Sequence, residues 1–265
     1  PLGTALASPP ADAGAPAVHG RAAILVDAAS GAVRLSDAAE RRMPIASLTK
    51  TMTAYLVLKA AKPTDLVEVE REDVRYAVNG GGTTAHLRPG DRLPVGDMLH
   101  ALMLPSGADA AHALARTYGP GVRGFVARMN ATARQLGMKD TYYVNADGLP
   151  MPGSDGYSTA KDQALLAVQA LRDPALRKVA STRRYTLHRT ATHRSYTWSN
   201  TNRLLGTRGA VGLKTGFTRA AGFSLAFAGE RGGRLLVGVI LGESVSSRRF
   251  ETARALLDWG SRQSA

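Results

Sequence analysis

The last third of the chain contains three short apolar runs separated by turn residues. The runs cover residues 211–217, 222–228 and 235–241, and Arg231-Gly232-Gly233 joins the last two. Apolar runs of this length, bounded by glycine-rich turns, are typical of β-strands. The pattern therefore predicts an antiparallel meander, in which residues 235–241 are apolar enough to form a central strand.

Similar β signals stand near the beginning of the chain. The apolar run 22–27, a turn at 28–31 and the run 32–35 predict a β-hairpin. A last amphipathic helix is expected over residues 247–259, burying Phe250, Ala253, Leu256 and Leu257. We therefore expect an α/β (α+β) fold whose five-stranded antiparallel sheet is built from both ends of the chain and flanked by helices.

The middle of the chain has helical periodicity interrupted by Gly and Pro. The predicted helices cover residues 95–104, 109–118, 122–136, 159–171 and 174–180. We expect a mostly helical subdomain, about 64–180, inserted into the sheet subdomain of a single domain that covers residues 20–265.

Residues 1–19 are rich in Ala, Pro and Gly and contain little to bury, so they are interpreted as a linker or tether. They lack the basic and apolar regions of a signal peptide, and no apolar run reaches the length of a membrane span. Any membrane association is therefore expected to depend on a segment outside this sequence.

The composition limits the chemistry that the chain can perform. There is no Cys, and the six His show no spacing typical of metal ligands, so neither a metal nor a cofactor is expected. The net charge of +13 comes from 34 Lys and Arg against 21 Asp and Glu, and 27 of the 34 are Arg. Such a charge suits an anionic polymer as a neighbour. The arginines are scattered and no nucleic-acid-binding motif occurs, so no nucleic-acid partner is predicted.

The segment Ser47-Leu48-Thr49-Lys50 begins a helix expected over residues 47–61. That helix is apolar on nearly every side, which is typical of a buried helix. Ser and Lys three residues apart lie on one face, and burial lowers a lysine pKa enough for the amine to take a serine proton. The spacing thus suits a nucleophile, Ser47, and its base, Lys50, although such a tetrapeptide is more often an N-cap followed by a solvated lysine. At the helix start, the Ser47 backbone N–H would also point at a developing oxyanion.

Two further segments complete a possible site. Lys214-Thr215-Gly216 lies on a predicted strand and offers a fixed charge, a hydroxyl and a glycine beside which a substrate backbone can lie. Ser106 lies in a loop between two predicted helices and offers a second hydroxyl to relay a proton. Each segment alone is equally typical of a strand-end lysine or a helix cap, so the prediction depends on their joint occurrence.

Together these segments resemble the low-molecular-weight penicillin-binding proteins, the serine D-alanyl-D-alanine carboxypeptidase and transpeptidase family, and most closely its small single-domain exported transpeptidases. The resemblance extends over about residues 20–260. It is carried by five segments: residues 47–53 (SLTKTMT), 99–115 (LHALMLPSGADAAHALA), 200–205 (NTNRLL), 212–218 (GLKTGFT) and 256–260 (LLDWG).

The resemblance implies an extracytoplasmic D,D-peptidase that acts on peptidoglycan stem peptides ending in D-Ala-D-Ala and is inhibited by β-lactams. It implies that Ser47 is acylated, Lys50 is the base and Ser106 assists proton transfer. Lys214 and Thr215 would orient the substrate, and the backbone N–H groups of Ser47 and Phe217 would form the oxyanion hole.

Two positions affect how the substrate would be held. The family has an arginine at the start of the last helix, where Arg249 stands, and this arginine or Lys214 would bind the terminal carboxylate. The family commonly has Asn two residues after the second serine, where this chain has Ala108. Because alanine cannot hydrogen-bond a substrate amide, the positioning of the substrate is expected to differ.

Two alternatives remain at this point. A serine β-lactamase shares both motifs, but class A enzymes add a Glu that activates the deacylating water. Between residues 140 and 160 this chain has Asp147 and Asp155 and no Glu. The other alternative is a non-catalytic cell-wall-binding protein of the same fold, which the change at Ala108 would suit.

Overall fold

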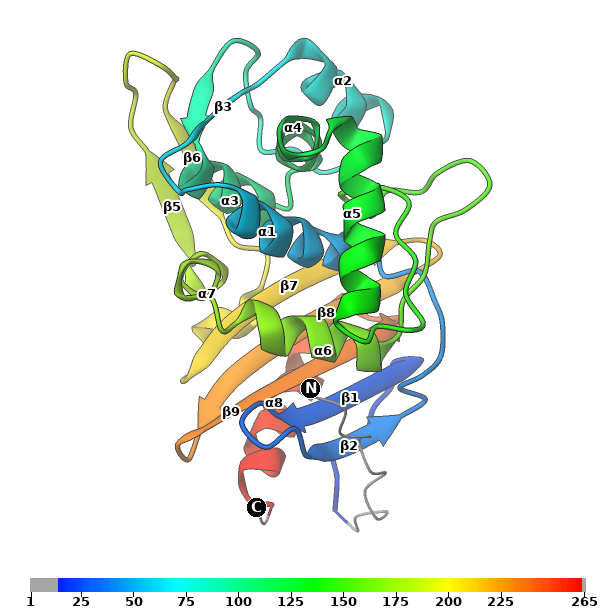
Figure 1. Cartoon of the computed structure of the whole chain (residues 1–265). Helices are drawn as coiled ribbons and strands as arrows, with labels where there is room; N and C mark the ends of the chain where they lie inside the picture. Colours follow the sequence, from blue (N-terminus) through cyan, green and yellow to red (C-terminus); the bar gives the residue numbers. More distant parts are fainter. Residues whose placement is uncertain (1–13, 264–265) are drawn as a thin grey trace.

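A five-stranded antiparallel sheet forms the centre of the computed structural model, which describes residues 14–263 (Figure 1). The strand order is β2-β1-β9-β8-β7. The strands are β1 (Ala22–Asp27), β2 (Val33–Asp37), β7 (Ala210–Thr218), β8 (Gly222–Arg231) and β9 (Arg234–Glu243). The predicted α+β fold is confirmed, because β1 of the N-terminal hairpin pairs with β9 and both ends of the chain contribute to one sheet.

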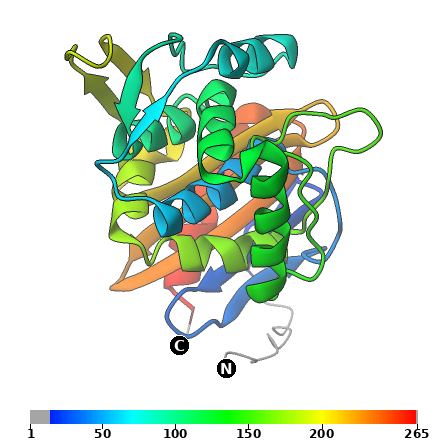
Figure 2. The same ribbon diagram turned by 45° about the horizontal axis from the view of Figure 1, so that its top comes forward.

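Helices cover both faces of this sheet (Figures 1 and 2). The last helix, α8 (Ser246–Ser261), packs on β8 and β9 and buries Phe250 and Leu257 against Leu25 and Phe227. On the opposite face, α6 (Ala160–Ala170) packs on β1 and β9, and the buried helix α1 (Thr49–Ala60) lies over α6. The sheet thus has two apolar faces, in agreement with its nearly continuous apolar strands.

The remaining helices surround α1, most of them beyond the edge strand β7 of the sheet (Figure 1). They are α2 (Arg71–Asn79), α3 (Val95–Met103), α4 (Ala108–Tyr118), α5 (Gly121–Gln135) and α7 (Pro174–Ser181). The sequence pattern did not predict α2 or two small hairpins. These hairpins are β3 (Leu66–Glu68) with β4 (Arg92–Pro94), and β5 (Arg184–Leu187) with β6 (Tyr196–Ser199).

The start of α1 differs from the prediction. Ser47 lies in a 3-10 turn, η1 (Ala46–Leu48), and the α-helix begins only at Thr49. Ala46 has a φ of 49°, which is uncommon for a residue with a side chain. The helix predicted over about residues 47–61 is therefore present, but its first turn, which carries Ser47, is a 3-10 turn that follows the tight turn at Ala46.

The first described residues have no regular secondary structure, and the part of the predicted linker that covers residues 1–13 lies outside the described range. Ala15 and Val18 pack against the apolar cluster beneath α8. Within residues 14–263, no helix is both long and apolar enough to cross a bilayer, and no group of three His, Asp or Glu side chains is placed to hold a metal ion.

Candidate active site

A cleft of about 450 Å³ separates the edge strand β7 from the helical region. It brings together segments that lie far apart in the sequence. Its lining consists of residues 80–83, 148–150 and 215–218, together with Ser47, Lys50, Pro105, Ser106, Thr201 and Arg249.

Ser47 and Lys50 form a hydrogen-bonded pair at the bottom of this cleft. The Lys50 Nζ lies 2.8 Å from the Ser47 Oγ and donates a second hydrogen bond of 3.0 Å to the backbone carbonyl of Asp147. Lys50 is 1% exposed, whereas Ser47 is partly accessible from the cleft. The structure therefore has the geometry of a nucleophile and its base.

Burial lowers the pKa of Lys50 to about 8, although the carboxylates of Asp147 and Asp109 act in the opposite direction. Both groups that its Nζ contacts are uncharged, so no ion pair compensates the loss of water. An amine with this pKa is partly neutral near pH 7 and can accept a proton.

Lys214 and Ser106 form a second pair across the cleft. The Lys214 Nζ donates to the Ser106 Oγ over 2.9 Å and to the carbonyl of Thr215 over 2.9 Å. Burial lowers the pKa of Lys214 well below its usual value, and the nearby charges of Lys50 and Arg249 lower it further. A negative charge in the cleft would therefore be stabilised by this lysine.

The loop of Ser106 is held by a residue that the sequence did not indicate. Ser106 has a φ of 66°, and its carbonyl accepts a hydrogen bond of 2.5 Å from the Thr83 hydroxyl. Thr83 lines the cleft, whereas Ala108 is fully buried at the first residue of α4 and donates its backbone N–H to the carbonyl of Thr83. Thr83, from a glycine-rich loop without helical or strand periodicity, thus holds the backbone on both sides of Gly107 and brings a hydroxyl to the cleft.

A second threonine was also missed as a site residue. The hydroxyls of Thr201 and Thr215 lie 2.6 Å apart, and both line the cleft. Thr201 precedes a short 3-10 turn, η2 (Arg203–Gly206), which is capped by the Asn202 side chain. The segment 200–205 carried the family resemblance, and this contact gives its physical role.

Gly216 lines the cleft, as its predicted place beside the substrate requires, and it has a structural reason as well. A Cβ at this position would lie 3.0 Å from the Ile45 carbonyl and 3.1 Å from the Ser47 backbone nitrogen. The glycine therefore lets β7 approach the 3-10 turn that carries Ser47. Gly148, with a φ of 87°, does the same from the other side, because its Cβ would overlap the Ala46 carbonyl.

The predicted oxyanion hole combines two elements that this close contact holds together. Ser47 belongs to η1 and Phe217 follows Gly216 on β7. The Phe217 side chain is 52% exposed at the cleft and stacks on Phe223 with 4.4 Å between ring centroids. The backbone N–H groups of Ser47 and Phe217 remain the predicted oxyanion donors.

Arg249 lines the cleft from α8 but is held by backbone groups. Its guanidinium donates to the carbonyls of Gly216 and Ser224, and to the carbonyl and hydroxyl of Ser246. In the described part of the chain it has no carboxylate partner, and burial, with a smaller effect from Arg203, lowers its pKa to about 10. A buried cation without an anion is suited to receive one from a ligand.

The acidic residues considered for water activation are not available in the cleft. The Asp147 carboxylate accepts hydrogen bonds of 2.7 Å from the Tyr76 hydroxyl and the Leu149 backbone N–H. Asp155 does not line the cleft, and none of the described lining residues is an Asp or a Glu.

Comparison with known proteins gives one consistent family. The family profile described as D-alanyl-D-alanine carboxypeptidase (peptidase S11) matches residues 10–245. The chain is 34% identical over 259 residues to D-alanyl-D-alanine carboxypeptidase DacC of Escherichia coli, covering 94% of this chain and 62% of that protein. It is 34% identical over 245 residues to a D-alanyl-D-alanine carboxypeptidase of Streptomyces sp. strain K15, covering 87% of this chain and 83% of the relative.

Solved structures agree with this result. The crystal structure of the Streptomyces K15 DD-transpeptidase matches with a TM-score of 0.88 at 32% identity, covering 94% of this chain and 99% of that one. A D-alanyl-D-alanine carboxypeptidase from Mycobacterium tuberculosis H37Rv matches with a TM-score of 0.86 at 29% identity, covering 95% of this chain and 96% of that one.

Proposed function

Because the chain belongs to the D-alanyl-D-alanine carboxypeptidase family, we propose that it is a serine D,D-peptidase acting on the D-Ala-D-Ala end of peptidoglycan stem peptides. The observation that carries this proposal is the hydrogen bond of 2.8 Å between the Ser47 Oγ and the Nζ of Lys50, a buried lysine whose Nζ has no anionic partner among the described residues. A structural lysine would have a carboxylate or water as its partner, whereas a base must be able to lose its proton.

The reaction starts when Lys50 takes the proton of Ser47 and the Oγ attacks the carbonyl carbon of the penultimate D-Ala. The backbone N–H groups of Ser47 and Phe217 stabilise the oxyanion. The C–N bond then breaks and the leaving D-Ala amine receives a proton through Ser106, which Lys214 contacts. Water or an acceptor amine attacks the ester and releases Ser47, which gives the carboxypeptidase or the transpeptidase product.

The cations of the cleft account for a preference for the end of a peptide. Arg249 and Lys214 are buried, lie near each other and have no carboxylate partner among the described residues. A terminal carboxylate would provide the missing negative charge, and Thr215 and Thr201 would supply hydroxyls beside it. The substrate places the enzyme outside the cytoplasm, at the cell envelope.

β-Lactams are expected to acylate Ser47 and to remain bound for a long time. Their amide occupies the place of the scissile peptide, and the described cleft holds no carboxylate that would activate a deacylating water. This absence does not favour a β-lactamase. A buried lysine without a carboxylate partner destabilises the fold, so a non-catalytic protein would gain nothing from keeping one beside a serine hydroxyl. The geometry therefore does not favour a non-catalytic role either.

The function is tested by measuring the D-Ala released from an N-acylated peptide ending in D-Ala-D-Ala, with and without a glycine acceptor. We expect release by the wild-type protein and none by Ser47→Ala. Mass spectrometry of the products separates hydrolysis from transfer to glycine. Absence of D-Ala release from a folded wild-type protein under both conditions would contradict the proposal.

A further inference from the structure

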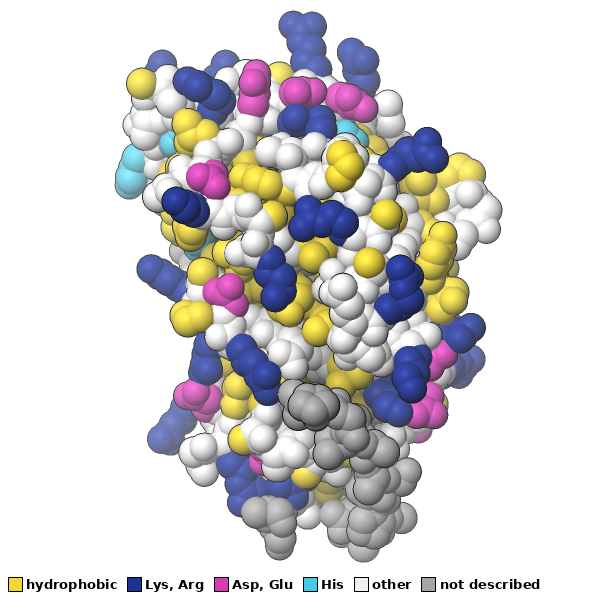
Figure 3. Space-filling view, viewed as in Figure 1, with side chains coloured by type: hydrophobic (Ala, Val, Ile, Leu, Met, Phe, Trp, Pro, Cys, Tyr) yellow, Lys and Arg dark blue, Asp and Glu magenta, His cyan; other side chains and the backbone are white. Residues whose placement is uncertain are grey.

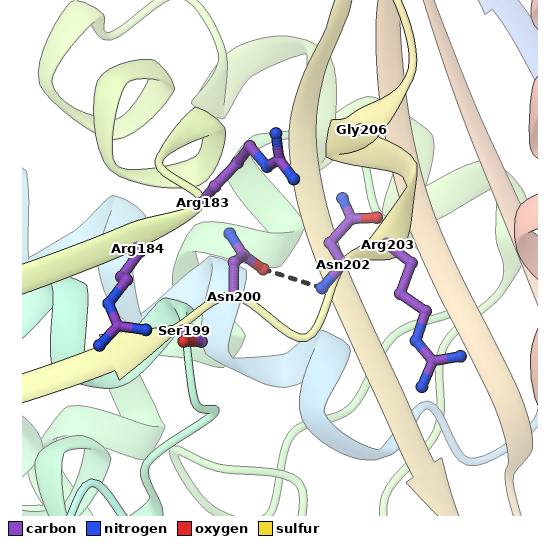
Figure 4. Close-up of a pocket in the computed structure, with 7 residues that line it drawn as sticks. All are labelled: Arg183, Arg184, Ser199, Asn200, Asn202, Arg203 and Gly206. Carbon is purple, nitrogen blue, oxygen red and sulfur yellow. Dashed lines mark hydrogen bonds between the residues drawn. The ribbon is translucent and has the colours of Figure 1, made fainter.

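A second cavity, of about 820 Å³, opens beside the catalytic cleft and is not used by the mechanism above (Figure 4). Its lining comes from the start of β5, the end of β6 and the turn η2. The lining residues are Arg183, Arg184, Ser199, Asn200, Asn202, Arg203 and Gly206.

The charge of this basic pocket, as we name this cavity, is not compensated within the protein. Three of its seven lining residues are arginines and none is acidic. In the described part of the chain, no carboxylate forms an ion pair with Arg183, Arg184 or Arg203, whereas other arginines, such as Arg194 and Arg231, are paired with Asp91 and Asp258. On the face drawn in Figure 3, Lys and Arg side chains lie singly or in small groups, so the chain has no general basic face there.

A buried amide in the same pocket also lacks a partner. Asn202 is 3% exposed, and its side-chain oxygen accepts the backbone N–H of Leu204, but its Nδ2 has no hydrogen-bond partner among residues 14–263. Figure 4 shows its side chain extending from the start of η2 toward Arg183. Buried polar groups nearly always have partners, so this unpaired N–H donor on the side of Arg183 indicates a missing acceptor.

The basic pocket and the catalytic cleft adjoin the same segment of the chain, residues 200–202. Thr201, which contacts Thr215 in the cleft, stands between Asn200 and Asn202, which line the basic pocket. The charge of Arg203 also acts on Arg249 at the cleft. A ligand that extends past the catalytic residues on this side would therefore reach the basic pocket.

Resting on the function proposed above, we propose that the basic pocket binds a second carboxylate of a peptidoglycan stem peptide, one that lies outside the scissile D-Ala-D-Ala unit. Guanidinium groups and an amide N–H are planar donors that match a carboxylate. The position of the basic pocket next to the cleft favours a group on the peptide substrate or acceptor over a separate polymer.

The test compares two pentapeptides that end in D-Ala-D-Ala, one with a free non-terminal carboxylate and one with this carboxylate amidated. Binding is measured by calorimetry on the Ser47→Ala protein, so that no turnover is needed. We expect the acid to bind about tenfold more tightly than the amide. The difference should disappear when Arg183→Gln and Arg184→Gln are combined.

Two further variants control this experiment. Arg189→Gln removes the same charge from the exposed β5–β6 turn outside the basic pocket and should keep the preference for the acid. Asn202→Asp keeps the oxygen that caps η2 but removes the amide donor, so it should lose the preference. Unfolding temperatures show that each variant is folded.

Equal binding of acid and amide to the protein with an intact pocket would overturn the proposal, as would a preference that survives in the Arg183 and Arg184 double variant. Binding of poly(glycerol phosphate) to the basic pocket without any preference between the peptides would assign it to another polymer and would also overturn it. Penicillin acylation by the double variant should equal that of the wild type. If penicillin does not acylate the wild-type protein at all, this result would instead count against the proposed function.

Discussion

Replacing Lys50 by methionine should abolish acylation without weakening the fold. Lys50 is 1% exposed, and in the described part of the chain its Nζ has two hydrogen-bond partners, the Ser47 Oγ and the carbonyl of Asp147. Methionine has a similar length and no charge, so it removes the base and the buried cation together. The variant therefore separates the catalytic use of this side chain from its effect on stability.

The pKa of Lys50 sets the size of the effect. Its fall from 10.5 to about 8 corresponds to about 3 kcal/mol of destabilisation by the buried charge, since one pKa unit is about 1.4 kcal/mol. Loss of the hydrogen bond to the Asp147 carbonyl costs about 1–3 kcal/mol. At pH 7 the free energy of unfolding of Lys50→Met should thus be equal to that of the wild type or up to about 2 kcal/mol higher.

The size of this stability difference between the variant and the wild type depends on pH. Between pH 8 and 10.5 the unfolded lysine keeps its proton while the folded lysine has lost it. Proton release on folding then stabilises the wild type as the pH rises, and the advantage of the variant shrinks. Below pH 8 both states of the wild type are protonated, so the difference stays constant.

Urea denaturation at pH 7 and pH 10 measures the stability, and the rate of labelling by a fluorescent penicillin measures acylation. Lys59→Met is the control, because Lys59 lies exposed on the same helix. Acylation within tenfold of the wild type, a barrier change below about 1.4 kcal/mol, would refute the base role. A loss of more than about 2 kcal/mol of stability at pH 7 would refute the account of the buried charge.

Three more outcomes follow from the geometry of the cleft. The acylation rate of the wild type should rise about fiftyfold between pH 6 and pH 8 and level off above pH 9, because Lys50 must be neutral; a flat profile in penicillin labelling would exclude a base with this pKa. Gly216→Ala should slow penicillin acylation about a hundredfold, because the new Cβ forces the Ser47 turn to move, and an unchanged rate would show that the turn can yield. Arg249→Ala should slow D-Ala release, because it weakens transition-state binding by a free energy on the order of 2–4 kcal/mol. Arg248→Ala should have little effect on this rate. C-terminally amidated peptides should be poor substrates of the wild type and no worse for the Arg249 variant, whereas equal losses for acid and amide would give this arginine a structural role.

The sequence was sufficient for the sheet and for the pair at the centre of the site. Strands 22–27 and 235–241 are long, apolar and bounded by turns, and these local features survive in any fold that buries them. The apolar surroundings of Lys50 could likewise be read from its helix, so its burial was predictable. The three-residue spacing from Ser47 requires only one helical turn, and it holds even though that turn is a 3-10 turn.

Other parts of the site depend on contacts between distant segments. Thr83 lies in a glycine-rich loop without periodicity, and its hydrogen bonds to the Ser106 carbonyl and the Ala108 backbone N–H, more than 20 residues away, bring it to the cleft. The reason for Gly216 is the backbone of η1, which the sequence could not place against β7. The unpaired amide of Asn202 is visible only when all of its neighbours are known.

The central claim is that Ser47 is the nucleophile, and the most direct test is to identify the residue that benzylpenicillin modifies. Intact-mass spectrometry of the wild-type protein with excess drug should show one adduct, and peptide mapping should place it on Ser47. The Ser47→Ala protein should remain unmodified. An adduct mapped to Ser106, or no adduct on a folded protein, would contradict the account.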